Sequence, residues 1–386
     1  MLALDHIKVL DLTRGYPGGW GAMFLGDFGA QIIKVDPPLH AGDLNSERDA
    51  AFFAPDRNKK TIILDLKTPA AKQVLYRLAE KDDVLIENNR PGVMKRLNCD
   101  YGTLKEINPR LIYCACSGFG QDGPYVDLPA HDMNYIAIAG ALSLVGPKDG
   151  PPCSPSNYLA DMAGCALHAA IGMLIALIAR EKTGRGQLVD ISYMDGVMSV
   201  MMCEATSYLS TGNVPKRGET MTTGGTLWAQ VYECRDGEYF TIACAEKHLW
   251  DNFCHAIGRE NLRHKHEATG EEKDRIVAEL AQIFATKTRH EWFEFFRDKN
   301  VCTGPVNYVD EAFMDPQVLH RQMLLEFAHP TVGRVRQLGI PIKLSDTPGS
   351  VRNLGSPIGT HTEEVLTDLG YSKYDIEELR CQGALG

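Results

Sequence analysis

The chain has 386 residues and a mass of 42.7 kDa, which is enough for two domains with a substantial hydrophobic core. Hydrophobic residues make up 44% of the chain and charged residues 23%, as is typical of a soluble globular protein. The formal net charge of -10 argues against non-specific binding of nucleic acid, which requires a basic surface that displaces counterions from phosphates.

Three further features limit the possible functions. Eleven cysteines include Cys114 and Cys116, but no second pair has the spacing of a zinc site, so reduced thiols and no metal are expected. The apolar segment 166–179 is too short to span a bilayer and is followed by Arg180, which predicts a buried helix and no membrane partner. The first residues lack the pattern of a secretory signal, so the expected location is the cytoplasm.

Short apolar strands alternate with helices in the first part of the chain. The patterns predict a strand at 7–12, a helix at 19–28, a strand at 31–35, a polar loop through Asn58, and strands at 61–65, 83–87 and 111–115. Thr68-Pro69 indicates a helix start, because proline is tolerated in the first turn of a helix. Such alternation predicts an α/β fold, with a parallel sheet covered by helices.

The pattern changes after Asp190. A helix at 194–209 precedes a stretch rich in Gly and Thr at 211–225, which we interpret as a linker. A smaller α+β unit follows, with strands at 230–233 and 239–243 around the turn Arg235-Asp-Gly237 and helices near 249–257, 273–285 and 289–300. The tail looks poor in strands from Val332 to a helix at 362–369. The predicted limits are therefore 1–210, 226–330 and 331–386.

A dinucleotide site is an alternative for the N-terminal strand, helix and strand, which end at Asp36. Gly19-Trp-Gly21-Ala-Met-Phe24 puts a phenylalanine where close packing requires a third glycine or alanine, and its glycines lie within the predicted helix rather than at the turn. The fingerprint is incomplete, so NAD binding is not expected. Gly15, Gly18 and Gly19 more plausibly let the backbone approach a ligand or a neighbouring chain.

Two side chains at predicted junctions between a loop and a helix are candidates for acid-base chemistry. His131 and Asp161 are residue types whose pKa values proteins tune for proton transfer at neutral pH. Glu246, in Ala243-Cys-Ala-Glu246, is a candidate partner. A single histidine before an apolar helix is more often a hydrogen-bonded structural residue, so none of the three identifies a function by itself.

Several sequence blocks follow one another in an order found in a known family. They are Ile7-Lys-Val-Leu-Asp-Leu-Thr13, Gly26-Asp-Phe-Gly-Ala30, Lys60-Thr-Ile-Ile-Leu-Asp-Leu-Lys67, Asn108-Pro-Arg-Leu-Ile-Tyr113, Ser117-Gly-Phe-Gly-Gln121, Thr183-Gly-Arg-Gly-Gln-Leu-Val-Asp190 and Gly359-Thr-His-Thr-Glu-Glu-Val365. Through these blocks the chain resembles, from end to end, the family III CoA-transferases and, within them, the α-methylacyl-CoA racemases.

The resemblance implies a fold and an activity. The fold would be a large Rossmann-like parallel-sheet domain and a smaller α+β domain, with a tail that returns to the large domain and two chains interlocked as rings in a homodimer. The activity would be racemisation of a 2-methylacyl-CoA thioester by two bases, which correspond to His131 and Asp161, with Glu246 supporting the histidine. No separate cofactor is implied, because CoA is part of the substrate.

Asp161 precedes the predicted helix that runs toward Arg180. The positive end of that helix would favour ionisation of the carboxylate by a few tenths up to about 2 kcal/mol. The same helix end offers unpaired N–H groups that could hold an enolate oxygen. The alternative is that Asp161 acts only as the N-cap of the helix.

Two competing functions use the same residues differently. In family III CoA-transferases the aspartate that matches Asp161 attacks the thioester and carries CoA through covalent intermediates. His131 discriminates between the two activities, because those transferases generally lack histidine at this position. A non-catalytic CoA-binding protein is a third possibility, since a fold alone does not determine a function.

An acidic chain that binds an anionic CoA ester needs a local basic patch, for which the candidates are Arg57, Lys59, Lys60, Arg90, Lys95 and Arg96; the alternative is that these residues form solvated faces. The resemblance adds CoA contacts from Leu64, Asp65, Leu66, Lys67 and Asn88, and from the string Ala130, Asp132, Met133, Asn134 and Tyr135 around the histidine.

Three departures from the racemases concern binding. Ala130 replaces a glycine, and Gly225-Thr-Leu-Trp-Ala229 differs from their usual run, so a different acyl pocket is expected. Pro37 replaces a basic residue, whose role Lys34 or Arg57 could take.

Overall fold

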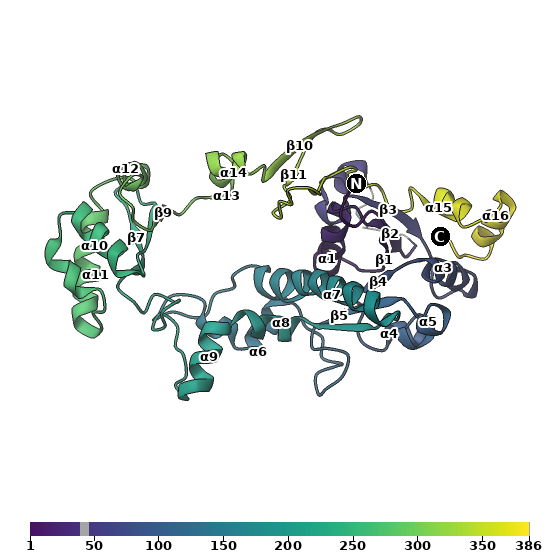
Figure 1. The fold of residues 1–386 in the computed structure, drawn as a ribbon, viewed down its shortest axis with the longest axis horizontal. Helices are drawn as coiled ribbons and strands as arrows, with labels where there is room; N and C mark the ends of the chain where they lie inside the picture. The colour runs from purple at the N-terminus through teal and green to yellow at the C-terminus, as the bar shows by residue number, and fades with distance from the viewer. Residues whose placement is uncertain (39–45, 386) are drawn as a thin grey trace. The chain divides into compact units, whose positions relative to one another are not determined.

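The computed structural model describes residues 1–38 and 46–385 (Figure 1). The chain forms two compact units. The first comprises Met1–Ala141, Pro155–Met201 and Gln317–Gly386, and the second comprises Leu142–Ser154 and Met202–Pro316. These limits differ from the predicted 1–210, 226–330 and 331–386, because a short segment before residue 155 clusters with the second unit and the C-terminal segment begins at Gln317.

A six-stranded sheet forms the centre of the first unit, in the order β3-β2-β1-β4-β5-β6. All neighbouring strands are parallel, as the alternating pattern predicted. The last strand was not predicted, although the alternation of its apolar residues with Asp190 and Ser192 was an available signal. The strands are β1 (Lys8–Asp11), β2 (Gln31–Asp36), β3 (Lys59–Ile63), β4 (Val84–Glu87), β5 (Ile112–Ser117) and β6 (Leu188–Ser192).

Helices accompany this sheet, including those predicted at 19–28 and after Thr68-Pro69. The hydroxyl of Thr68 accepts the N–H of Ala71 at 3.2 Å, and Pro69 opens the helix that follows. The predicted polar loop before Asn58 contains two helical segments instead, and its residues 39–45 lie outside the described part of the chain. The helices are α1 (Tyr16–Asp27), α2 (Glu47–Phe52), η1 (Ala54–Asp56), α3 (Pro69–Lys81), α4 (Val93–Arg96), α5 (Tyr101–Ile107), α6 (Asp132–Ile138), η2 (Ala141–Leu144) and α8 (Tyr193–Val200).

The apolar helix predicted at 166–179 is longer and less buried than expected. A π-helix, η3 (Tyr158–Leu167), continues directly into α7 (His168–Thr183). Together they span 26 residues, and their most apolar 18-residue window has a mean hydropathy of 2.1. Within residues 1–38 and 46–385 this is the one helix long and apolar enough to cross a membrane. Core helices of soluble proteins share that length and composition, but here Ile175 and Ile178 are 61% and 64% exposed.

The second unit contains a three-stranded antiparallel sheet, β7-β8-β9. The predicted hairpin is confirmed, since β7 pairs with β8 and Gly237 in its turn has a φ of 78°. Aromatic side chains fill the core, including Trp250, Phe253, Phe284 and Trp292. The elements are α9 (Met202–Thr211), β7 (Ala229–Glu233), β8 (Tyr239–Ala243), α10 (Lys247–Ala256), η4 (Glu260–Lys265), α11 (Gly270–Phe284), α12 (Arg289–Phe296), β9 (Thr303–Pro305), α13 (Val309–Ala312) and, at its boundary, α14 (Pro316–His320).

The C-terminal segment returns to the large sheet. The tail from Val332, predicted to be poor in strands, contains one strand, β11 (Gly333–Leu338). It pairs antiparallel with β10 (Leu324–His329) and is followed by α15 (Thr362–Asp368) and α16 (Lys373–Cys381). In β11, Arg334 and Arg336 alternate with the buried Val335 and Gln337, which makes the strand look polar. The N–H of Asp65, after β3, donates to the carbonyl of Ala384 at 2.8 Å, which ties the end of the chain to the sheet.

Candidate active site

A cavity of about 530 Å³ opens at the carboxyl ends of the parallel strands in the first unit. Arg14 and Asn88 line it and follow β1 and β4, which lie side by side in the sheet. The strands after β1 are added on one side of this pair, and the strands after β4 are added on the other side. Ligands of open α/β sheets bind at such a switch point. The cavity is lined by seven of the residues that the sequence singled out, namely Asn88, Arg90, Ala130, His131, Asn134, Tyr135 and Asp161.

His131 is the N-cap residue of α6. Its N–H donates to Oδ1 of Asn134 at 3.1 Å, and the hydroxyl of Tyr135 donates to the carbonyl of Ala130 at 2.6 Å, so the loop is held on both sides of the histidine. The Tyr135 ring lies so close to Gly118 that a Cβ there would be 2.3 Å from it. The imidazole is exposed and lines the cavity, so a ligand there can reach it.

Asp161 lies in the first turn of η3 rather than before the helix. The N-cap is Asn157, whose side chain donates to Oδ2 of Asp161 at 3.5 Å, so the interpretation of Asp161 as an N-cap is wrong. Burial and the nearby Asp132 raise the pKa of Asp161, against the opposing effects of Asn157 and His131. The contribution of the helix end to ionisation of this carboxylate stays a prediction, since burial and Asp132 act in the opposite direction. A carboxylate with a raised pKa is a better proton acceptor.

Asp132 connects the two candidate bases. Its Oδ2 atom accepts the N–H of Ala160 at 3.0 Å and that of Asp161 at 2.8 Å, so these two N–H groups are not unpaired as expected. Asp132 is 8% exposed, and its Oδ1 is buried without a hydrogen-bond partner among the described residues. The predicted contact of Asp132 with CoA is therefore wrong: this side chain positions η3 against the start of α6.

A second cavity of about 270 Å³ lies at the same edge of the sheet, lined by residues at or after the ends of β1, β2, β3 and β4. Arg14 and Asn89 line both cavities and so connect them. The sequence did not indicate Arg14 as a site residue, although a cation directly after a buried strand was the available signal. Asn88 fixes its backbone through two hydrogen bonds of 2.8 Å. The predicted residues that line this second cavity are Leu64, Asp65, Leu66, Lys67 and Arg96.

Arg57 is buried and cannot offer its charge to a phosphate. Its side chain is 1% exposed and forms two hydrogen bonds to Asp27, from Nε to Oδ1 at 2.9 Å and from Nη2 to Oδ2 at 2.5 Å. Nη1 donates to the carbonyl of Leu338 at 2.6 Å. The predicted CoA contact is wrong, because this guanidinium joins α1 to the C-terminal segment.

Lys59 and Lys34 are buried in the same way. Lys59 pairs with Asp11 at 2.6 Å, and Lys34 pairs with Asp36 at 3.2 Å and donates to the carbonyl of Thr13 at 2.8 Å. Burial raises the pKa of Asp11, but Lys59 and Lys34 outweigh it and lower this pKa to about 2. The predicted ligand contacts of both lysines are therefore wrong, and their charges stabilise the carboxyl end of β1.

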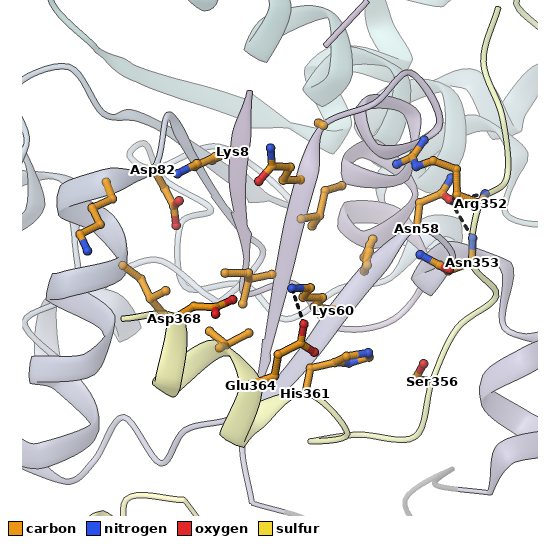
Figure 2. Close-up of a pocket in the computed structure, with 18 of the residues that line it drawn as sticks. Lys8, Asn58, Lys60, Asp82, Arg352, Asn353, Ser356, His361, Glu364 and Asp368 are labelled. Atoms are coloured by element: carbon orange, nitrogen blue, oxygen red, sulfur yellow. Dashed lines mark hydrogen bonds and ion pairs between the residues drawn. The ribbon is translucent and has the colours of Figure 1, made fainter. Parts of the chain in front are cut away.

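The remaining predicted residues lie elsewhere. Lys95 and Met133 are exposed but line neither cavity. Glu246 is the N-cap residue of α10 in the second unit, so its support of His131 stays a prediction. Lys60 points into a third cavity, of about 630 Å³, and pairs with Glu364 of α15 at 2.8 Å (Figure 2). That cavity lies where the strands begin, at the edge of the sheet opposite to His131 and Asp161.

Asp82 lines the same cavity at the strand starts (Figure 2). It is 6% exposed, its Oδ2 has no hydrogen-bond partner among the described residues, and burial raises its pKa to about 7 although Lys8 opposes this shift. The folded protein thus holds this proton more tightly than the unfolded chain, and stability is lost as the pH rises from about 4 to 7.

Replacing Asp82 by asparagine is therefore expected to stabilise the protein at pH 8, by about 2 kcal/mol, because it removes the cost of a buried charge. At pH 3.5 the carboxyl is protonated in both states, and the variant and the wild type should differ little. Urea unfolding at the two pH values measures the difference. An equal effect at both values would contradict the buried, unpaired state of this carboxyl.

Comparisons with known proteins agree with the fold. Residues 4–362 match CoA-transferase family III. The chain is 34% identical to human alpha-methylacyl-CoA racemase, covering 98% of this chain and 96% of the relative. It is also 32% identical to formyl-CoA:oxalate CoA-transferase of Rhodopseudomonas palustris, covering 99% of this chain and 97% of that relative. A crystal structure of a CaiB/BaiF family protein from Brucella suis superposes with a TM-score of 0.81 at 28% identity, covering 95% of this chain and 99% of the other. The chain belongs to CoA-transferase family III, whose fold and enzyme class it shares.

Proposed function

We propose that this protein is a racemase of 2-methylacyl-CoA thioesters that acts by exchange of the α-proton between two bases. The observation that carries the proposal is that His131 and Asp161 line one cavity at the switch point of the sheet. A cytoplasmic location, as expected from the sequence, is part of the proposal.

The chemistry follows from the thioester. Its carbonyl withdraws electrons, so the hydrogen on the adjacent carbon can leave as a proton when a base is held nearby. One base removes the proton from one face, the negative charge moves onto the thioester oxygen, and the other base delivers a proton to the opposite face. Histidine is a residue type commonly used as a general base. The raised pKa of Asp161 makes its carboxylate a better proton acceptor than an ordinary aspartate.

CoA transfer between carboxylic acids is the second candidate. It is favoured by the similar identity of the chain to a racemase and to CoA-transferases, and it would use the Asp161 carboxylate as a nucleophile. His131 distinguishes the two proposals, because transfer needs no second base.

The test is proton NMR of the purified protein with one enantiomer of a 2-methylacyl-CoA in deuterated water. Racemisation predicts that the α-hydrogen signal is lost and that optical purity falls at the same time. A parallel reaction contains a labelled carboxylic acid as CoA acceptor. Label entering the thioester while the α-hydrogen and the chirality stay unchanged would reject racemisation in favour of transfer.

Asp132→Asn is expected to move the acidic limb of the pH profile of kcat/KM for α-proton exchange to lower pH. The asparagine oxygen can still accept the N–H groups of Ala160 and Asp161, but the like charge that helps raise the pKa of Asp161 is gone. Asp161 would then act as a base at lower pH. The measurement is kcat/KM for α-proton exchange between pH 4 and 9, and an unshifted limb would contradict the coupling.

A homodimer is also part of the proposal. The side chains of Ile171, Leu174, Ile175 and Ile178 on α7 are 37% to 64% exposed and follow helical spacing, so they form one apolar stripe. Burying such a stripe against a second copy would remove it from water. Ile175→Asp is expected to convert a dimer into a monomer in light scattering, whereas Tyr374→Asp, on exposed α16, should not. A wild-type monomer would contradict this proposal.

A further inference from the structure

A fourth cavity, apolar and about 420 Å³ in volume, lies beside the candidate active site in the first unit. Tyr16, Trp20 and Phe24 line it from α1, where a spacing of four residues places them on one side of the helix. Tyr158, Met162 and Leu167 line it from η3. We call this space the aromatic cavity.

The aromatic cavity adjoins the position of the proposed chemistry. Tyr16 lines both the aromatic cavity and the cavity of His131 and Asp161. On η3, Tyr158 lies three residues before Asp161 and Met162 directly after it. On the other side, Arg14 and Asn89 connect the His131 cavity to the cavity of Leu64, Asp65, Leu66 and Lys67. The three cavities therefore form a row, with charged residues at one end and apolar residues at the other.

We propose that the aromatic cavity holds the acyl group of the thioester and selects uncharged, hydrophobic acyl groups, while CoA extends toward Arg14 and Lys67. This inference rests on the proposed function of the site. It follows from the row of cavities, because a thioester whose reacting carbon lies between His131 and Asp161 has its acyl group and its CoA on opposite sides. The pantetheine and phosphates suit the charged end, and a hydrocarbon suits the apolar end.

The lining of the aromatic cavity also argues against dicarboxylic acyl groups. Its described lining contains no Lys, Arg or His, and its one amide side chain is Asn157. A terminal carboxylate entering the cavity would lose its hydration without gaining a cationic partner, which is costly. Two of the relatives are transferases named for oxalate and glutarate. We infer that this chain discriminates against such charged acyl groups.

The experiment compares the affinities of acetyl-CoA, octanoyl-CoA and glutaryl-CoA for the full chain by titration calorimetry. Octanoyl-CoA is expected to bind at least about tenfold more tightly than acetyl-CoA, because burying only part of its additional hydrocarbon gives a gain of that size. Glutaryl-CoA should bind no more tightly than acetyl-CoA. Trp20→Ala should reduce the octanoyl preference severalfold.

Tyr158→Arg keeps the test decisive if Trp20→Ala does not fold, because Tyr158 is 65% exposed. This variant should lose most of the octanoyl preference and gain affinity for glutaryl-CoA. Tyr374→Arg, at a position 77% exposed on α16, is the matched control and should change neither. The reason is that the control adds the same charge at a position that lines none of the three cavities.

Equal affinity of the wild type for acetyl-CoA and octanoyl-CoA would overturn the inference, and so would an octanoyl preference that Tyr158→Arg leaves unchanged. Dissociation of a dimer by Tyr158→Arg, without an octanoyl preference in the wild type, would mean that a second copy covers the cavity and would also overturn it. Binding is measured without turnover. An octanoyl preference in a protein that exchanges no α-proton would therefore reject the proposed chemistry and support the acyl site.

Discussion

His131→Ala and Asp161→Asn are each expected to abolish racemisation, with kcat/KM falling by a factor of about 10² to 10⁴, the usual contribution of a positioned acid or base. The two-base mechanism predicts a further asymmetry. Each variant keeps one base, which can still remove the α-proton of one enantiomer and return deuterium to the same face. His131→Ala and Asp161→Asn should therefore exchange opposite enantiomers without inverting them, which NMR combined with chiral chromatography measures.

Controls for these variants are available on the surface of the protein. His6→Ala and Asp298→Asn replace the same residue types at side chains that are 71% and 83% exposed, and should leave the rates unchanged. Circular dichroism verifies that all four variants fold. Racemisation that persists in His131→Ala would reject the two-base mechanism. Loss of CoA transfer in Asp161→Asn, with no α-proton exchange in the wild type, would support the transferase.

Arg57→Ala is expected to lower the free energy of unfolding by about 3–5 kcal/mol, the usual cost of breaking a buried ion pair. The substitution leaves the Asp27 carboxylate buried, with the side chain of Asn58 still donating to it at 2.9 Å. It also removes the donor to the carbonyl of Leu338, so the contact between α1 and the C-terminal segment weakens. Urea unfolding followed by tryptophan fluorescence measures the loss.

The matched control is Arg235→Ala, which breaks an ion pair of 2.8 Å with Glu291 between side chains about half exposed. A loss of about 1 kcal/mol or less is expected there, because water screens the charges. If Arg57→Ala were no more destabilising than this control but weakened CoA binding, the interior role of Arg57 would be wrong. The original prediction of a phosphate contact would then be supported.

Elements with a local cause were predictable. The start of α3 depends on Thr68 and Pro69, which cap and open the helix without help from distant residues. The β7–β8 hairpin depends on Asp236-Gly237, where glycine allows a positive φ. The parallel sheet followed from the alternation of short apolar strands with helices along the first part of the chain.

Predictions that depended on distant partners failed. The sequence around Arg57, Lys59 and Lys60 reads as one basic patch, but two of the three cations are buried against Asp27 and Asp11, from 30 and 48 positions away. The polar sequence of β11 becomes a strand because β10 supplies its hydrogen bonds. Nothing local to Asp161 indicated that Asp132 would accept its N–H from 29 positions away.

The sequence by itself determined the fold class, the order of the elements and the residue types that the chemistry needs, since these depend on periodicity, turn chemistry and the motifs around His131 and Asp161. Only the tertiary structure decided which of the charged residues face a ligand, that both bases line one cavity, and that an apolar cavity adjoins it. The reason is physical: burial and pairing determine what a charge can do, and both arise when segments far apart in the chain pack together.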